Sequence, residues 1–237
     1  MRIPFSPPDI TEKEIEQVSE ALRSGWITTG PKTKELEREV ADLCGVNRAV
    51  CLNSQTACAE MTLRLLGIKE GDEVITCAYT YTASASVVCH VGAKLILIDT
   101  QRDCLEMDYE QLENAITEKT KVIIPVDLGG VPCDYDRILS IVERKKDLFH
   151  PANKIQKSIG RVIVMADAAH AFGATWKEKP VGSIADFSNF ILMELITKKF
   201  IISTSCYHFM VSQKMHLRKR SLGHGSMTSS DLGLNVI

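Results

Sequence analysis

The stretch VIVMADAAHAFGA, residues 162–174, decides the fold class. It opens with an apolar run, Val162 to Met165, which is short enough for a buried strand. The run delivers one acid, Asp167, at its carboxyl end, and small residues and His170 follow. In open α/β sheets, ligands bind at the carboxyl ends of strands. A carboxylate followed by two alanines suits a flat ring that approaches the backbone, and an aspartate that caps the next helix is an equally good interpretation.

Composition sets the class of protein. The 237 residues suit one large domain or two small ones, and 45% hydrophobic with 24% charged residues is typical of a soluble globule. A net charge of −2 gives no argument for nucleic acid or an anionic membrane. No apolar run approaches the roughly 18 residues of a membrane span. The eight cysteines are scattered without a C-x-x-C pair, so we expect a cytoplasmic protein with no metal site.

Strand and helix patterns alternate on both sides of the opening stretch. Strands are predicted at 49–52, 73–76, 94–98, 122–126, 162–165 and 185–190, and helices at 11–24, 33–43, 54–66, 83–90, 109–116 and 134–145. Residues 146–160 are predicted to be an irregular, charged insertion. This alternation predicts an α/β fold with a mostly parallel sheet flanked by helices.

Two further turns, each after a predicted strand, contain residues that could bind a ligand. Asn53 to Thr56 places hydroxyls and free backbone N–H groups at a helix amino terminus, which suits a phosphate, although an ordinary cap is the commoner use. Tyr79 and Tyr81 offer aromatic faces to a planar ring, although two half-buried core tyrosines are more common. With Asp167, these turns form the minimum set for pyridoxal phosphate (PLP), whose protonated ring nitrogen an acid can hold.

The chain also carries a series of motifs in order. They are Pro4-Phe-Ser-Pro, Ser24-Gly-Trp-Ile-Thr-Thr-Gly-Pro-Lys32, Asn53-Ser-Gln-Thr-Ala57, Gly71-Asp-Glu-Val-Ile75, Val91-Gly-Ala93, Thr117-Glu-Lys-Thr-Lys121, Ala166-Asp-Ala-Ala-His170 and Val181-Gly-Ser. With these motifs, residues 3–190 resemble the DegT/StrS-type sugar aminotransferases, which are fold-type-I PLP enzymes. The resemblance implies a large domain built on a seven-stranded-type sheet, a homodimer, PLP as cofactor, glutamate as amino donor and a nucleotide-linked keto sugar as acceptor.

The resemblance also implies roles for single residues. Ser54 and Thr56 would lie at the cofactor phosphate, with Gln55 between them where the family usually has Gly. Tyr81 would stack on the ring, Asp167 would hold the ring nitrogen, and His170 would support the cofactor from the same turn. The loop from Trp26 to Lys32 would lie near the substrate, with Trp26, Thr28, Thr29 and Lys32 as its contacts. A plain turn between helices is the alternative for this loop.

The catalytic lysine does not match the family. The family pattern after residue 190 is close to S-F-H-x-x-K-N, and its lysine forms the Schiff base with the cofactor. In register, the lysine position holds Ile196, and Lys198 and Lys199 come two and three residues late. On a strand or turn that shift changes the face or moves the amine by several ångströms. We therefore expect little or no transamination.

Residues 191–237 do not resemble the family as written. Residues 1–190 are expected to be an incomplete large domain without the small domain, and the tail to be poorly ordered. Reading residues 189–237 one frame over, with allowed codon choices, gives a stop-free string that resembles the family's continuation, including its S-L-H-G stretch. A reading-frame break near residue 190 is therefore a hypothesis.

A non-catalytic remnant that pairs with an intact paralogue is an alternative. A dehydratase ranks last, because Ile196 cannot replace its histidine, and no G-x-G-x-x-G supports an NAD enzyme.

Overall fold

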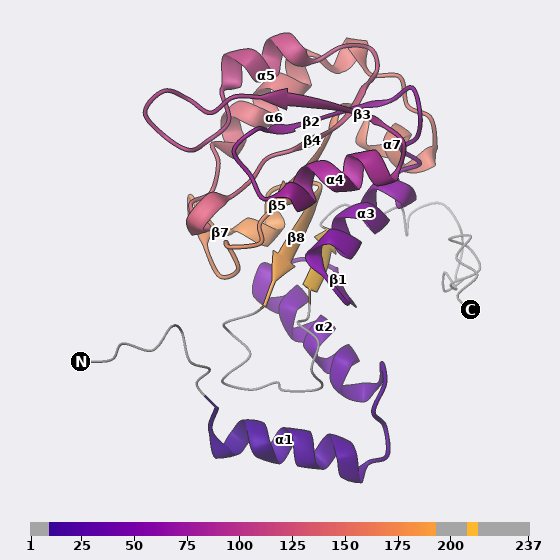
Figure 1. The fold of residues 1–237 in the computed structure, drawn as a ribbon, viewed down its shortest axis with the longest axis vertical. Coiled ribbons are helices and arrows are strands. Elements are labelled where there is room, and N and C mark those ends of the chain that lie inside the picture. The colour runs from indigo at the N-terminus through magenta and orange to yellow at the C-terminus, as the bar shows by residue number, and fades with distance from the viewer. Residues whose placement is uncertain (1–9, 193–207, 213–237) are drawn as a thin grey trace.

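A computed structural model describes residues 10–192 and 208–212, and its main feature is a seven-stranded sheet (Figure 1). The strand order is β1-β9-β8-β5-β4-β2-β3. The strands are β1 (Arg48–Leu52), β2 (Glu73–Cys77), β3 (Lys94–Ile98), β4 (Thr120–Ile124), β5 (Ile163–Asp167), β8 (Phe187–Ile191) and β9 (His208–Ser212). A separate two-stranded ribbon joins β6 (Thr175–Trp176) to β7 (Lys179–Pro180).

The five strands β3, β2, β4, β5 and β8 pair in parallel, which confirms the predicted mostly parallel sheet. The exception is β9, which pairs antiparallel with both β1 and β8. It comes from the tail that does not resemble the family, and the sequence did not predict it. Ile196, Lys198 and Lys199 lie outside the described residues.

The described residues form seven α-helices, and all but α1 pack against this sheet. They are α1 (Glu12–Arg23), α2 (Pro31–Cys44), α3 (Gln55–Leu65), α4 (Thr82–His90), α5 (Tyr109–Ala115), α6 (Tyr135–Arg144) and α7 (Lys154–Ile159), with 3-10 turns η1 (Leu128–Gly130), η2 (Lys146–Leu148) and η3 (Val181–Ser183). Side chains of α3 and α4 pack on one face, and those of α2, α5 and α6 on the other. Because both faces are covered, alternate residues of β5 enter different cores: Ile163 and Met165 one, and Val164 and Ala166 the other.

The prediction of an irregular insertion at 146–160 is wrong in its second half, because α7 forms there. Asn153 caps this helix by accepting a hydrogen bond from the Gln156 backbone N–H at 2.9 Å. Gly160 ends the helix with φ +74°, a conformation that glycine adopts without strain. The side-chain amides of Asn153 and Gln156 both donate to the Leu66 carbonyl, at 2.7 and 2.8 Å, and so anchor the segment to the end of α3.

The amino-terminal helix α1 lies apart from the sheet, and α2 connects the two (Figure 1). A capping box between Thr11 and Glu14 starts α1, as the sequence predicted. Lys32, on the first turn of α2, holds α1 through Gln17 and Glu20, with its Nζ 2.5 and 2.7 Å from their side-chain oxygens. Every helix in the described part of the chain is too short or too polar to traverse a bilayer.

Candidate functional site

The acid of the opening stretch, Asp167, is the last residue of β5 and is only 6% exposed. Ser84 Oγ on α4 donates to Asp167 Oδ2 at 2.6 Å, and the backbone N–H of Ala169 donates to Oδ1 at 3.3 Å. Burial raises the pKa of Asp167 above its ordinary value, and the Ser84 hydrogen bond opposes that rise. Within the described residues this carboxyl makes no ion pair. A cationic partner would therefore relieve the desolvation of its anionic form.

The amino terminus of α3 faces the same end of the sheet. Ser54 is its N-cap and accepts a hydrogen bond from the Ala57 backbone N–H at 3.0 Å. Thr56 is half-buried in the first turn. Gln55 does not point to solvent: it is 5% exposed, and its amide lowers the pKa of Asp167. A helix amino terminus with unpaired N–H groups and nearby hydroxyls fits a phosphate.

Tyr79 and Tyr81 follow β2, and Tyr81 is the N-cap of α4. Tyr81 is 79% exposed and Tyr79 56%, so neither ring belongs to the core. This exposure contradicts the interpretation of two half-buried core tyrosines. The Tyr81 ring is available for stacking at the end of the sheet that carries Asp167.

A second buried acid, Asp127, follows β4 and was not among the site residues predicted from the sequence. Its Oδ1 accepts from the Cys133 backbone N–H at 2.9 Å, and its Oδ2 accepts from the Tyr135 hydroxyl at 2.8 Å. Its own N–H donates to the Asp167 carbonyl at 2.9 Å. Burial raises the pKa of Asp127 to about 7, and the neighbouring Asp167 adds to the rise. The sequence contains the pattern that identifies such an acid, because an aspartate follows an apolar strand here as it does at Asp167.

The turn after β4 also fixes the ring of His170. The Gly129 backbone N–H donates to His170 Nδ1 at 3.3 Å, so in the neutral ring the proton is on Nε2. A Cβ on Gly130 would lie 2.9 Å from the His170 carbonyl oxygen, so this close approach requires glycine. His170 is exposed and can offer its Nε2–H to a ligand.

The predicted substrate loop makes its contacts elsewhere. Trp26 Nε1 donates to the Thr29 carbonyl at 2.9 Å, and Lys32 is held by α1. Thr28 and Thr29 are exposed. In the portion that the structure describes, no hydrogen bond joins this loop to Asp167 or its neighbours. The loop joins α1 to α2, and Figure 1 shows it well apart from β5, so one copy of the chain does not place this loop at the end of β5.

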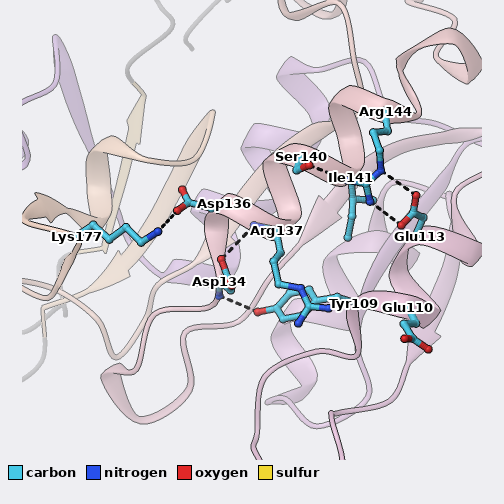
Figure 2. A pocket seen from close by; sticks show the side chains of 10 residues that line it. All are labelled: Tyr109, Glu110, Glu113, Asp134, Asp136, Arg137, Ser140, Ile141, Arg144 and Lys177. Carbon is cyan, nitrogen blue, oxygen red and sulfur yellow. Dashed lines mark hydrogen bonds and ion pairs between the residues drawn. The ribbon is translucent and has the colours of Figure 1, made fainter.

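A polar hollow between α5 and α6 is a separate feature (Figure 2). Its charges are largely paired with one another: Arg144 contacts Glu113 at 2.7 Å, and Lys177 contacts Asp136. Arg137 lies over the Tyr109 ring, 4.5 Å from its centroid. None of the predicted cofactor residues lines it. Among the described residues, no group of three or more His, Cys, Asp or Glu side chains is arranged to hold a metal ion.

This fold, with a buried acid at the end of β5 and a helix amino terminus at the same end of the sheet, matches the α/β fold of PLP-dependent aminotransferases. The model of the DegT/DnrJ/EryC1/StrS aminotransferase family matches residues 8–192, and the chain belongs to this family. The family is PLP-dependent, and the structures that the chain matches include a candidate sugar aminotransferase solved in its PLP and PMP forms. The resemblance read from the motifs is thereby confirmed.

Three relatives illustrate the similarity. The chain is 37% identical over 188 residues to the spore coat polysaccharide biosynthesis protein SpsC of Bacillus subtilis, covering 79% of this chain and 44% of SpsC. It is 40% identical over 180 residues to the UDP-4-amino-4-deoxy-L-arabinose–oxoglutarate aminotransferase of Shewanella sediminis, covering 76% and 42%. Spr1654 of Streptococcus pneumoniae, a candidate sugar aminotransferase in its PMP form, superposes with a TM-score of 0.84 at 52% identity, covering 90% and 53%. The chain thus spans about half the length of these relatives.

Proposed function

We propose that the chain binds PLP at the carboxyl ends of β2 and β5 and serves amino transfer from glutamate to the keto group of a nucleotide-linked sugar. The observation that carries the cofactor half is Asp167, a buried carboxyl that no cationic side chain pairs with in the described ranges. The names of the Shewanella and Bacillus relatives support the sugar half, since one is an amino-sugar–oxoglutarate aminotransferase and the other acts in polysaccharide biosynthesis. When bound, PLP supplies an electron-withdrawing ring for amino transfer.

The residues at this end of the sheet fit the chemistry of PLP. Asp167, held by Ser84, would accept a hydrogen bond from the protonated ring nitrogen, and that cation would lower the raised pKa of Asp167. Tyr81 offers its exposed ring for stacking. The turn of Ser54, Gln55 and Thr56 would hold the phosphate at the start of α3. Because the Gly129 N–H occupies its Nδ1, His170 would have its Nε2–H to donate to the cofactor.

No residue at the family's lysine position can carry out the proton transfer. Ile196 occupies the position at which the family pattern has its lysine, and a hydrocarbon side chain can neither attach the cofactor nor move a proton. We infer that this chain holds the cofactor but transfers amino groups poorly. A non-catalytic remnant, or a binding partner of an intact paralogue, is the second candidate, and Ile196 favours it. Sequencing the gene across codons 185–195 tests the frame hypothesis, because an unbroken gene that does not spell the shifted string refutes it.

We also infer a homodimer. Ile15 and Leu22 on α1, and Trp26 and Ile27 after it, are each half or more exposed, on a helix that lies apart from the sheet. Exposed apolar side chains gathered on one segment mark an interaction surface. A second copy is also a route by which the Trp26–Lys32 loop reaches a site that it does not contact in its own chain.

The seven cysteines among the described residues are free, which is consistent with the cytoplasm as the location.

The test is a titration of purified protein with PLP, followed by absorbance. The wild type is compared with Asp167→Asn and with a control, Asp136→Asn, whose carboxyl is 57% exposed and pairs with Lys177. We expect saturable binding that Asp167→Asn weakens at least tenfold and that the control leaves unchanged. Equal affinity in all three proteins would remove Asp167 from the site. Borohydride reduction and peptide mass then locate any covalent adduct, and one on Lys198 or Lys199 would show that a late lysine replaces the missing one.

A further inference from the structure

Asp127 is a buried acid to which the proposed function assigns no role. It follows β4 and is only 1% exposed. Its Oδ1 accepts from the Cys133 backbone N–H at 2.9 Å, and its Oδ2 accepts from the Tyr135 hydroxyl at 2.8 Å. Both donors lie at the far end of the connection between β4 and α6, since α6 begins at Tyr135. The carboxyl therefore closes residues 127–135 into a loop, which we call the β4–α6 loop.

The start of this loop is fixed to β5. The Asp127 backbone N–H donates to the Asp167 carbonyl at 2.9 Å, and Val126 forms a parallel bridge with Asp167. The Gly130 backbone N–H donates to the Asp127 carbonyl at 3.2 Å, which turns the chain back. The loop thus begins beside Asp167, the residue from which the turn to His170 starts.

Two glycines of the loop contact His170. The Gly129 N–H donates to its Nδ1 at 3.3 Å, and a Cβ on Gly130 would lie 2.9 Å from its carbonyl oxygen. Both glycines have positive φ, +62° and +83°. Glycine loses more conformational freedom on folding than any other residue, so a loop with two of them needs contacts elsewhere to keep one conformation. The two hydrogen bonds to the Asp127 carboxyl supply such contacts.

We propose that Asp127 is a positioning residue for His170: its carboxyl closes the β4–α6 loop, and the closed loop keeps the Gly129 N–H on His170 Nδ1. Asp127 acts on the imidazole through this loop. The ring is then held with its Nε2–H available to a ligand. For the effect on PLP the inference rests on the proposed function, whereas the effect on the ring requires no ligand.

The first test observes the His170 ring without any ligand. Protein labelled with 15N-histidine is followed by NMR at a pH well above the ordinary histidine pKa of about 6.5. The His170 signals are those that His170→Ala removes. A ring nitrogen that accepts a hydrogen bond differs in 15N chemical shift from one that does not, so Nδ1 reports on the Gly129 contact. We expect Asp127→Ala to move the Nδ1 signal toward that of a ring without this bond. Tyr135→Phe should move it in the same direction but less, because the hydrogen bond from Cys133 to Asp127 remains.

The control is Asp134→Asn, because Asp134 lies in the same loop but its carboxyl accepts from the Arg137 backbone N–H at 3.1 Å. The substitution removes the same charge and leaves a good helix cap, so the Nδ1 signal should stay in place. Unchanged Nδ1 signals in both Asp127→Ala and Tyr135→Phe overturn the inference, and so does an equal shift in the control. If Asp127→Ala does not fold, Tyr135→Phe removes only a hydroxyl and decides the matter alone.

The second test is a double-mutant cycle on PLP affinity. In the wild type, Asp127→Ala should weaken binding about 2- to 10-fold, roughly the contribution of one hydrogen bond. In a His170→Ala background the same substitution should change the affinity by less than about twofold, because Asp127 acts through this ring. An equal loss in both backgrounds would mean that Asp127 acts on the fold as a whole, and it overturns the inference. If the Nδ1 signal shifts but no protein binds PLP, the positioning role stands and the proposed function fails.

Discussion

Removal of Asp186 should destabilise the fold severely, because it is one half of a buried ion pair that ties β5 to β8. Arg161 Nη1 lies 2.7 Å from Asp186 Oδ2, and its Nη2 lies 3.1 Å from Oδ1, so the pair is bidentate. Asp186 Oδ2 also accepts from the Val164 backbone N–H at 2.9 Å. The two side chains are only 10% and 1% exposed. This geometry fixes the loop before β8 on the start of β5.

The magnitude follows from burial. Asp186→Ala leaves the Arg161 guanidinium buried without its counter-charge, which costs about 3–5 kcal/mol. Whole domains are stable by about 5–15 kcal/mol, so the loss is a large share of the total. With a urea m-value of about 2–3 kcal/mol/M, the unfolding midpoint should fall by about 1–2 M. Far-ultraviolet circular dichroism across a urea series measures it.

The control is Lys177→Ala, which breaks an ion pair with Asp136 whose side chains are 67% and 57% exposed. Such a pair contributes about 0–1 kcal/mol, so the midpoint should barely move. Replacing both Arg161 and Asp186 with apolar residues should recover much of the stability, since a buried pair gains little over well-packed hydrophobic residues. If Asp186→Ala costs no more than the control, the assignment of this pair as a buried constraint is refuted.

Three further predictions concern the site. Ser84→Ala removes the 2.6 Å donor to Asp167 and should weaken PLP binding by a factor of about 2–10 in the absorbance titration; undiminished affinity would exclude Ser84 from the site. Gly130→Ala should lower stability in the urea assay by about 1–2 kcal/mol or more, and by more than Gly129→Ala, because both have positive φ but only Gly130 also meets the His170 carbonyl. Burial raises the pKa of Asp127 from 3.8 to about 7, so the folded state binds a proton more tightly than the unfolded state does. Stability should therefore fall as pH rises from about 4 to about 7 and be level above that, and Asp127→Asn should flatten this slope; a slope that persists in the variant would point to another group.

Much of the fold could be predicted because the central strands are buried on both faces. A strand such as β5 reads as a continuous apolar run, and short helices with clear caps separate such runs. The prediction failed where local pattern is weak. The helix α7 has a polar sequence and is held by side-chain amides that reach the Leu66 carbonyl, a contact 87 to 90 residues away along the chain. No local pattern reports such a contact.

The candidate site was likewise predictable only where its residues follow a local sequence pattern. Asp167 was predictable because it ends an apolar strand in sequence. The burial of Gln55 was not, because a glutamine at the start of a helix normally faces water, yet Gln55 is only 5% exposed. Asp127 had the same signal as Asp167, because it directly follows the strand predicted at 122–126. The order of the motifs along the chain does not show how far apart they lie in space. The separation of Trp26, Thr28 and Thr29 from Asp167 therefore could not be predicted.

The groups that hold the cofactor and the group that performs the chemistry lie in different parts of the chain, which makes binding and turnover separable. Asp167, Ser84 and His170 all lie between residues 84 and 170, whereas the family's lysine position is residue 196. Loss of the lysine should therefore abolish the covalent adduct and amino transfer while it leaves non-covalent PLP affinity measurable. A chain that binds PLP saturably without a borohydride-stable adduct would act as a cofactor-binding remnant, whereas steady-state amino transfer to a keto sugar would require a second lysine to have taken over.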